Sequence, residues 1–246
     1  MARSHAGQGR MPRSDVVTRG LLAFLLTLAF VVTAAPPAAA DDALEARQLV
    51  EKSQLTLESF MADHEIEAIR DLMTKARGVF IAPQVLKGAF IVGASGGSGV
   101  FLARDDLVKP WSGPAFYTIG SVSFGLQIGG EASEVVLLAM TERGLSAMLG
   151  STVKLGADAS VALGPVGAGA SAATAALSVD MLAFSRAKGL YGGISVDGAV
   201  IAVRSDWNRA YYGKDIEPAD ILVRRSVSTP HAAGLVAAVT KASGMK

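Results

Sequence analysis

Between residues 79 and 140, short apolar runs alternate with glycine, proline and charged residues. The runs lie at 79–82, 89–92, 100–103, 116–119, 122–124, 126–128 and 135–140. Runs of this length, separated by turn residues every ~8–12 positions, are typical of an antiparallel sheet, sandwich or barrel. Further runs at 177–184, 190–196 and 199–203 continue the pattern, and Asp197-Gly198 between the last two predicts a hairpin.

Helical spacing flanks this block of strands. Apolar residues recur every three or four positions towards the end of residues 42–76, which predicts helix there, and Arg77-Gly78 ends the pattern. Shorter helices are expected at 141–149, 207–212 and 231–241. The chain is therefore predicted to be α+β, with an antiparallel sheet sandwich or barrel-like core flanked by N- and C-terminal helices.

The first 40 residues have the layout of a secretory signal peptide. Four arginines precede a twelve-residue apolar run at 21–32, and small residues with two prolines then lead to Ala38-Ala39-Ala40. The run is shorter than the ~20 apolar residues that a membrane-spanning helix needs. We therefore expect cleavage after Ala40, export to the periplasm or the medium, and one domain over residues 41–246. An uncleaved membrane anchor is the alternative.

Composition narrows the chemistry of the exported part. Without residues 1–40, the remaining 206 residues carry 19 basic and 21 acidic side chains, which gives no electrostatic footprint for nucleic acid. The absence of cysteine excludes thiol catalysis and cysteine-ligated metal. His64 and His231 lack neighbours at metal-ligand spacing, so no metal or other cofactor is predicted.

Residues 93–97, GASGG, match the G-x-S-x-G pattern of a nucleophile elbow, and His231 follows Ser95 in the order found in hydrolases. An elbow needs a helix after its serine, whereas a strand-like run follows here at 100–103. Glycines that form a tight hairpin turn, or a turn that holds phosphate through backbone N–H groups, explain the same residues. A serine hydrolase using Ser95 and His231 is thus the lesser alternative, and no enzymatic activity is predicted.

Basic side chains gather near the predicted strand ends, with aromatic residues close to some of them. The candidate lipid-binding residues are Lys75, Arg77, Lys87, Arg104, Lys109, Trp111, Arg186 and Lys188. Cations that bind phosphate beside a Trp that settles at a membrane interface are typical of a lipid head-group site. A solvated rim above core aromatic residues is the simpler interpretation.

Several segments, in order, resemble the SYLF domain family. They are ARGVFIA at 76–82, GGSGV at 96–100, WSGPAF at 111–116, GLQIG at 125–129, LGADA at 155–159, GPVG at 164–167, KGLYGGI at 188–194 and YYG at 211–213. The resemblance implies a non-enzymatic domain that binds phospholipid head groups, with phosphoinositides favoured by eukaryotic members, some of which also bind actin.

Two departures from that family limit what the resemblance implies. Residues 41–61 carry five acidic and two basic side chains, where eukaryotic members have a basic amphipathic segment, so an anionic membrane would repel this part. Ala168 follows the GPVG segment where a basic residue is expected. We predict an exported phospholipid-binding protein at or near the cell envelope, its protein partners unknown, with a structural or protein-interaction module of the envelope as the alternative.

Overall fold

The computed structural model describes residues 39–63, 67–89, 92–104, 110–124, 129–164, 178–187 and 196–245. The chain divides into two compact units, Met1–Ala38 and Ala39–Lys246, and every described residue belongs to the second. No helix in the described ranges combines the length and the apolar character needed to cross a bilayer.

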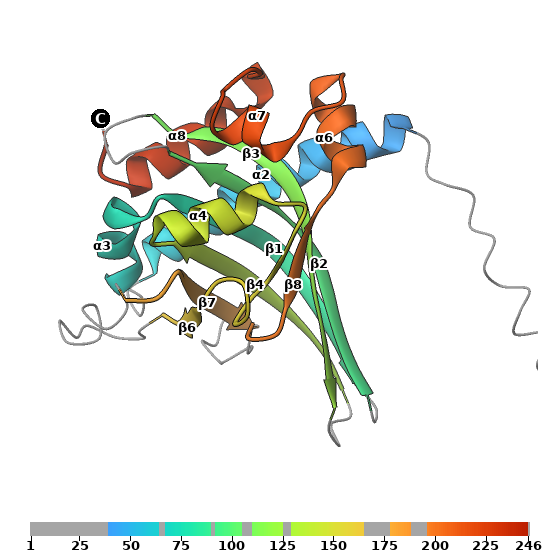
Figure 1. The fold of residues 1–246 in the computed structure, drawn as a ribbon, viewed down its shortest axis with the longest axis vertical. Helices are drawn as coiled ribbons and strands as arrows, with labels where there is room; N and C mark the ends of the chain where they lie inside the picture. Colours follow the sequence, from blue (N-terminus) through green and yellow to red (C-terminus); the bar gives the residue numbers. More distant parts are fainter. Residues whose placement is uncertain are drawn as a thin grey trace, which may run out of the picture. The chain divides into compact units, whose positions relative to one another are not determined.

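An eight-stranded sheet, in the order β5-β8-β3-β2-β1-β4-β7-β6, forms the centre of the second unit (Figure 1). Neighbouring strands are antiparallel, except that β6 and β7 run parallel. The sheet curls into a half-barrel, which confirms the predicted α+β class. The strands are β1 Gly78–Ala89, β2 Val92–Ala103, β3 Ser112–Phe124, β4 Gly129–Ala139, β5 Thr152–Lys154, β6 Val161–Leu163, β7 Met181–Ala187 and β8 Val200–Val203.

Helices precede, interrupt and follow the strands. They are α2 Ala39–Ala62, α3 Glu67–Lys75, α4 Glu142–Leu149, α6 Ser205–Tyr212, α7 Pro218–Leu222 and α8 Ala233–Ala242, with a 3₁₀ turn η1 at Pro230–Ala232. The predicted helices near 141–149 and 207–212 are confirmed. Gly213, with φ 73°, ends α6 in the left-handed region, as glycine commonly does after a helix.

Three sequence predictions need correction. The single helix predicted over 42–76 is two helices, α2 and α3. The glycine-rich segment at 93–97 is not a turn but part of β2, paired with both β1 and β3. Residues 153–161, whose loose alternation of apolar and polar positions also predicts a strand, form no continuous strand and contribute only to β5 and β6. The hairpin partner at 190–196 and the GPVG segment lie largely outside the described residues.

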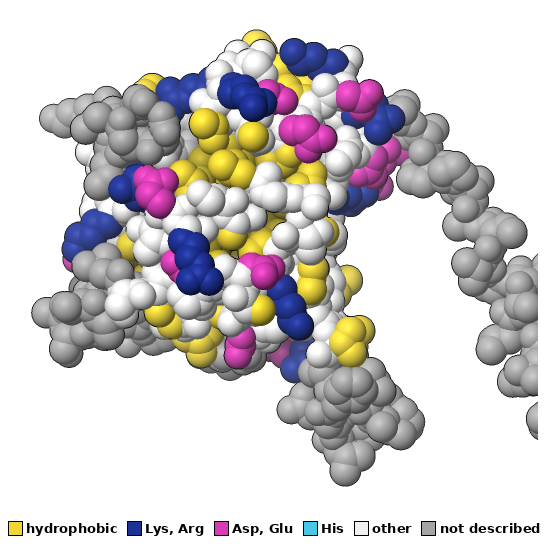
Figure 2. Space-filling model, viewed as in Figure 1, with side chains coloured by type: hydrophobic (Ala, Val, Ile, Leu, Met, Phe, Trp, Pro, Cys, Tyr) yellow, Lys and Arg dark blue, Asp and Glu magenta, His cyan; other side chains and the backbone are white. Residues whose placement is uncertain are grey.

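Alternate residues of the central strands point to opposite faces, and both faces are buried. In β1, Val79 and Ile81 join one apolar cluster with residues of α2, α3 and α8, whereas Phe80 and Ala82 join a second cluster with residues of α4 and α7. This period of two is what a strand dictates. We call these the α2 face and the α4 face of the sheet. On the α4 face, hydrophobic side chains gather between α4 and α7 (Figure 2).

Candidate functional site

A groove on the α2 face is lined by residues of α2, α3 and α8 and by Gly244, which follows α8. Its cavity volume is about 640 Å³, within the range of small-molecule sites. Apolar walls come from Leu57, Met61 and Ala62 of α2 and from Ala238 and Ala242 of α8. The small side chains on α8 leave the space open, so the groove offers apolar surface next to solvent.

Charged side chains from all three helices also line the groove. They are Glu58 of α2, Arg70 and Asp71 of α3, and Lys241 of α8. The Arg70 guanidinium is already engaged, because Nε donates to the Met61 carbonyl oxygen at 2.8 Å and Nη2 to that of Asp63 at 3.1 Å. The side chains of Asp71 and Lys241 are exposed and have no hydrogen bond or ion pair to another described residue.

A second, smaller groove of about 330 Å³ lies between the first half of α2 and the strands β1 and β2. Its lining includes Lys52, Gly97 and the buried Trp207. The Arg204 guanidinium lies 3.7 Å from the centroid of the Trp207 ring, and its Nη1 donates to Ser98 Oγ at 3.2 Å. This groove has fewer apolar walls, so we do not take it as the principal site.

The six predicted lipid-binding residues that the structure describes do not form one cluster. Lys75 is exposed at the end of α3, next to Thr74 of the larger groove. Arg77 forms an ion pair with Glu142 at the start of α4. Lys87 lies near the C-terminal end of β1, where it is paired in register with Ser95 of β2 and Glu131 of β4. Lys109 and Lys188 lie outside the described residues.

Arg104 and Trp111 lie together in the interior. The Arg104 side chain is 1% exposed, and its guanidinium donates to the carbonyl oxygens of Ala76 at 2.8 Å and Thr74 at 2.6 Å, at the C-terminal end of α3. It also lies 5.0 Å from the centroid of the Trp111 ring, while Trp111 Nε1 donates to Ser243 Oγ at 3.0 Å. A head group cannot reach these groups in this conformation, so we do not carry them into the site.

Arg186 of β7 is also engaged within the protein. Its guanidinium donates to Glu134 Oε2, with Nε at 2.9 Å, and to Ser59 Oγ at 2.7 Å. The same group lies 4.8 Å from the centroid of the Phe60 ring. Arg186 therefore ties α2 to β4 and β7, and its charge is balanced by acidic neighbours.

Ser95 and His231 do not form a catalytic pair. Ser95 lies inside a strand, and its hydroxyl is 2.8 Å from the Ser121 hydroxyl. His231 Nδ1 lies 3.1 Å from the Tyr211 hydroxyl, and Nε2 lies 3.3 Å from Glu51 Oε1. The strand-to-helix elbow that the serine would need is absent at this position, because β2 continues to Ala103.

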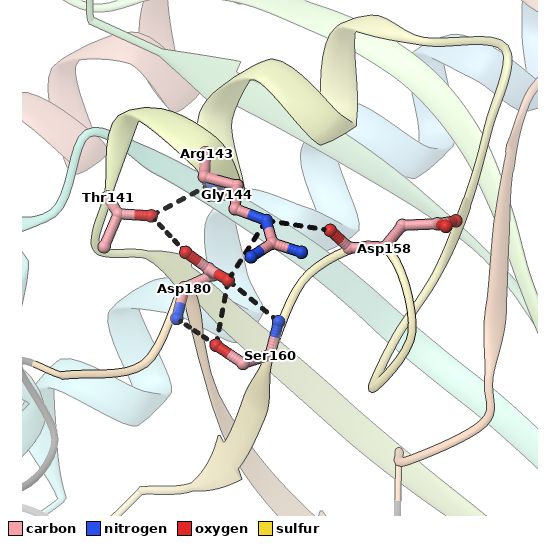
Figure 3. Close-up of polar contacts among 6 residues, drawn as sticks. All are labelled: Thr141, Arg143, Gly144, Asp158, Ser160 and Asp180. Carbon is pink, nitrogen blue, oxygen red and sulfur yellow. Dashed lines mark hydrogen bonds and ion pairs between the residues drawn. The ribbon is translucent and has the colours of Figure 1, made fainter.

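On the α4 face, the Asp180 carboxylate is the centre of a polar network (Figure 3). It accepts hydrogen bonds from Thr141 Oγ1 at 2.6 Å, from the Ser160 backbone N–H at 2.9 Å and from Ser160 Oγ at 2.8 Å. Burial acts to raise the pKa of Asp180, but these hydrogen bonds and the nearby Arg143 outweigh it and lower the pKa below its ordinary value. The network joins the start of α4, the segment before β6 and the start of β7.

Sequence reasoning missed the groove. Its walls come from residues on three helices that are separated along the chain by up to about 180 positions, and the predicted site was sought near strand ends. One signal was present: residues 231–241, predicted as a closing helix, contain few large side chains.

Comparison with known proteins gives a consistent picture. The family model described as "Ysc84: Las17-binding protein actin regulator" matches residues 120–242. SH3 domain-containing YSC84-like protein 1 of Homo sapiens is 34% identical over 153 residues, which cover 61% of this chain and 44% of the relative. SH3 domain-containing protein PJ696.02 of Schizosaccharomyces pombe is 36% identical over 168 residues, covering 66% and 38%.

A third relative, LAS seventeen-binding protein 3 of Saccharomyces cerevisiae, is 32% identical over 161 residues, covering 63% of this chain and 34% of the relative. The chain thus spans less than half the length of each of these curated relatives.

Proposed function

Because this chain belongs to the Ysc84 family, the family of the SYLF domain, we propose that it is an exported, non-enzymatic protein that binds phospholipid at or near the cell envelope. The observation that carries the proposal is the apolar groove between α2, α3 and α8, with exposed charges along it. The names of the family and of one relative describe binding proteins, which supports binding over catalysis.

In this proposal an acyl chain lies against Leu57, Met61 and Ala238, and the head group remains at the solvent side near Lys241. Each methylene that leaves water contributes ~0.8 kcal/mol, so part of one chain is enough to give measurable affinity. Lys75, which is exposed beside Thr74, is the predicted lipid-binding residue nearest to the groove in sequence, but it does not line the groove.

The test is co-sedimentation of the full chain with phospholipid vesicles, comparing Ala238→Trp with Ala237→Trp. Ala238 lines the groove, whereas its neighbour Ala237 is exposed on the same helix and does not. We expect Ala238→Trp to reduce the bound fraction several-fold and Ala237→Trp to leave it unchanged. Since residues 21–32 are common to both variants, any membrane affinity of that run cancels. Equal binding by the two variants would contradict the groove as the lipid site.

Export is tested separately. The protein is expressed in a bacterial host, and the N-terminal residue of the protein recovered from outside the cytoplasm is determined. We expect it to begin at Asp41. Cleavage after Ala40 would leave α2 intact apart from its first two residues, Ala39 and Ala40. A protein that starts at Met1 and stays in the cytoplasm would contradict the proposal.

Binding of a protein partner is a second candidate function. The family model and the Saccharomyces cerevisiae relative are named for binding Las17. On this chain, Leu86 and Val122 lie near the C-terminal ends of β1 and β3 and are 55% and 67% exposed. Exposed apolar surface often marks an interface. This function would be favoured if the chain does not bind lipid but binds one protein, and if Leu86→Asp abolishes the binding of that protein.

A further inference from the structure

The groove on the α2 face carries charges of both signs in equal number, and this bears on the class of lipid. We infer that it takes a single phospholipid with a zwitterionic head group, of the phosphoethanolamine type, in preference to a net anionic lipid. The inference rests on the proposed phospholipid function and assigns the head-group class and its contacts: phosphate at Lys241, ammonium at Glu58 and Asp71.

The formal charges along the groove sum to zero. The lining contains two cations, Arg70 and Lys241, and two carboxylates, Glu58 and Asp71. A net neutral lining gives no Coulombic preference for a net negative head group, but separated charges complement both ends of a zwitterion. Complementary charges of this kind contribute more to the specificity of binding than to its affinity.

The charges that remain available for a ligand come from different helices. Arg70 is held by two backbone carbonyl groups at the end of α2, which leaves Lys241 of α8 as the cation that can turn to a phosphate. The Asp71 carboxylate on α3 has no partner among the described residues. Glu58 on α2 accepts one hydrogen bond from Gln54 Nε2 at 2.9 Å and is otherwise exposed.

The surroundings of the groove disfavour an anionic lipid. The helix α2, which forms one wall, carries five acidic and two basic side chains. Its field repels a net negative head group or membrane surface and leaves a neutral one nearly unaffected. A phosphate held by Lys241 with an ammonium close by avoids this repulsion, because its own positive end faces the carboxylates.

The experiment is calorimetric titration of the full chain with two monomeric single-chain lipids, each below its critical micelle concentration. Lysophosphatidylethanolamine is zwitterionic, and lysophosphatidylglycerol is anionic. We expect the first to bind more tightly. Lys241→Glu should weaken its binding roughly tenfold, about what the loss of one charge-assisted hydrogen bond is worth. Glu58→Lys should shift the preference towards lysophosphatidylglycerol.

Lys154→Glu is the matched control, because Lys154 is an exposed residue of β5 and does not line the groove. It makes the same change in net charge and should leave both affinities unchanged. Equal affinity for the two lysolipids, or equal effects of Lys241→Glu and Lys154→Glu, would overturn the inference while phospholipid binding stands. If neither lysolipid binds but vesicles do, the inference also falls. Failure with vesicles as well would remove the proposed function itself.

Discussion

The Asp180 network on the α4 face and the groove on the α2 face use charged side chains in opposite ways. On the α4 face, Asp180 is 8% exposed and its carboxylate is satisfied by Thr141 and Ser160, so its charge holds segments of the protein together. On the α2 face, the groove leaves Lys241 and Asp71 exposed and without partners among the residues that the structure describes. The contrast separates charges that stabilise the fold from charges that are available to a ligand.

The largest expected effect comes from removing the Asp180 carboxylate. Asp180→Ala leaves the Thr141 hydroxyl and both donors of Ser160 without their acceptor, in a partly buried region. Each buried group left unsatisfied costs ~1–3 kcal/mol, so we expect the free energy of unfolding to fall by about 4 kcal/mol. Urea denaturation measures it. Asp215→Ala, at an exposed ion pair with Arg209, should change stability far less.

A buried cation on the α2 face gives the next largest effect. That face also contains charges that stabilise the fold, as Asp180 does on the α4 face. Arg104→Met removes the donor to the carbonyl groups of Ala76 and Thr74 at the end of α3. We expect a loss of roughly 3 kcal/mol from those unsatisfied acceptors. Lys241→Ala, which removes an exposed cation on the same face, should leave the denaturation midpoint nearly unchanged. Similar losses from both variants would break the distinction drawn between the two kinds of charge.

The central strands were predictable because both of their faces are buried. Runs such as 79–82, 100–103 and 135–140 are apolar at every position, and the structure places alternate residues in the two clusters. The strands proved longer than these runs because glycine and serine positions also pair. Gly97 permits this in β2, where a Cβ would lie 2.2 Å from the Gln84 carbonyl oxygen. Composition alone assigns such a segment to a turn.

The candidate site was less predictable, because it depends on which charges find partners. The sequence places Arg104, Arg186 and Lys75 alike near strand ends. The fold buries the first beneath α3, pairs the second with Glu134, and leaves the third exposed. Nothing local in the sequence distinguishes them, since the hydrogen-bond partners of the two arginines lie between 28 and 141 positions away.

The smallest expected effect is on how stability changes at acidic pH, and it depends on Asp180 alone. The folded-state pKa of Asp180 is lowered below its ordinary value, about 3.9 in an unfolded chain. Its contribution to stability is therefore fully present above that value and is lost as the pH falls through the folded-state pKa. In Asp180→Asn this titration is absent, so stability should start lower near pH 7 but decline less as the pH falls below about 4. Thermal unfolding midpoints across that range measure the difference. Parallel curves for the two proteins would mean that Asp180 is not the carboxylate that holds the α4 face together, since its ionisation would then have no bearing on folding.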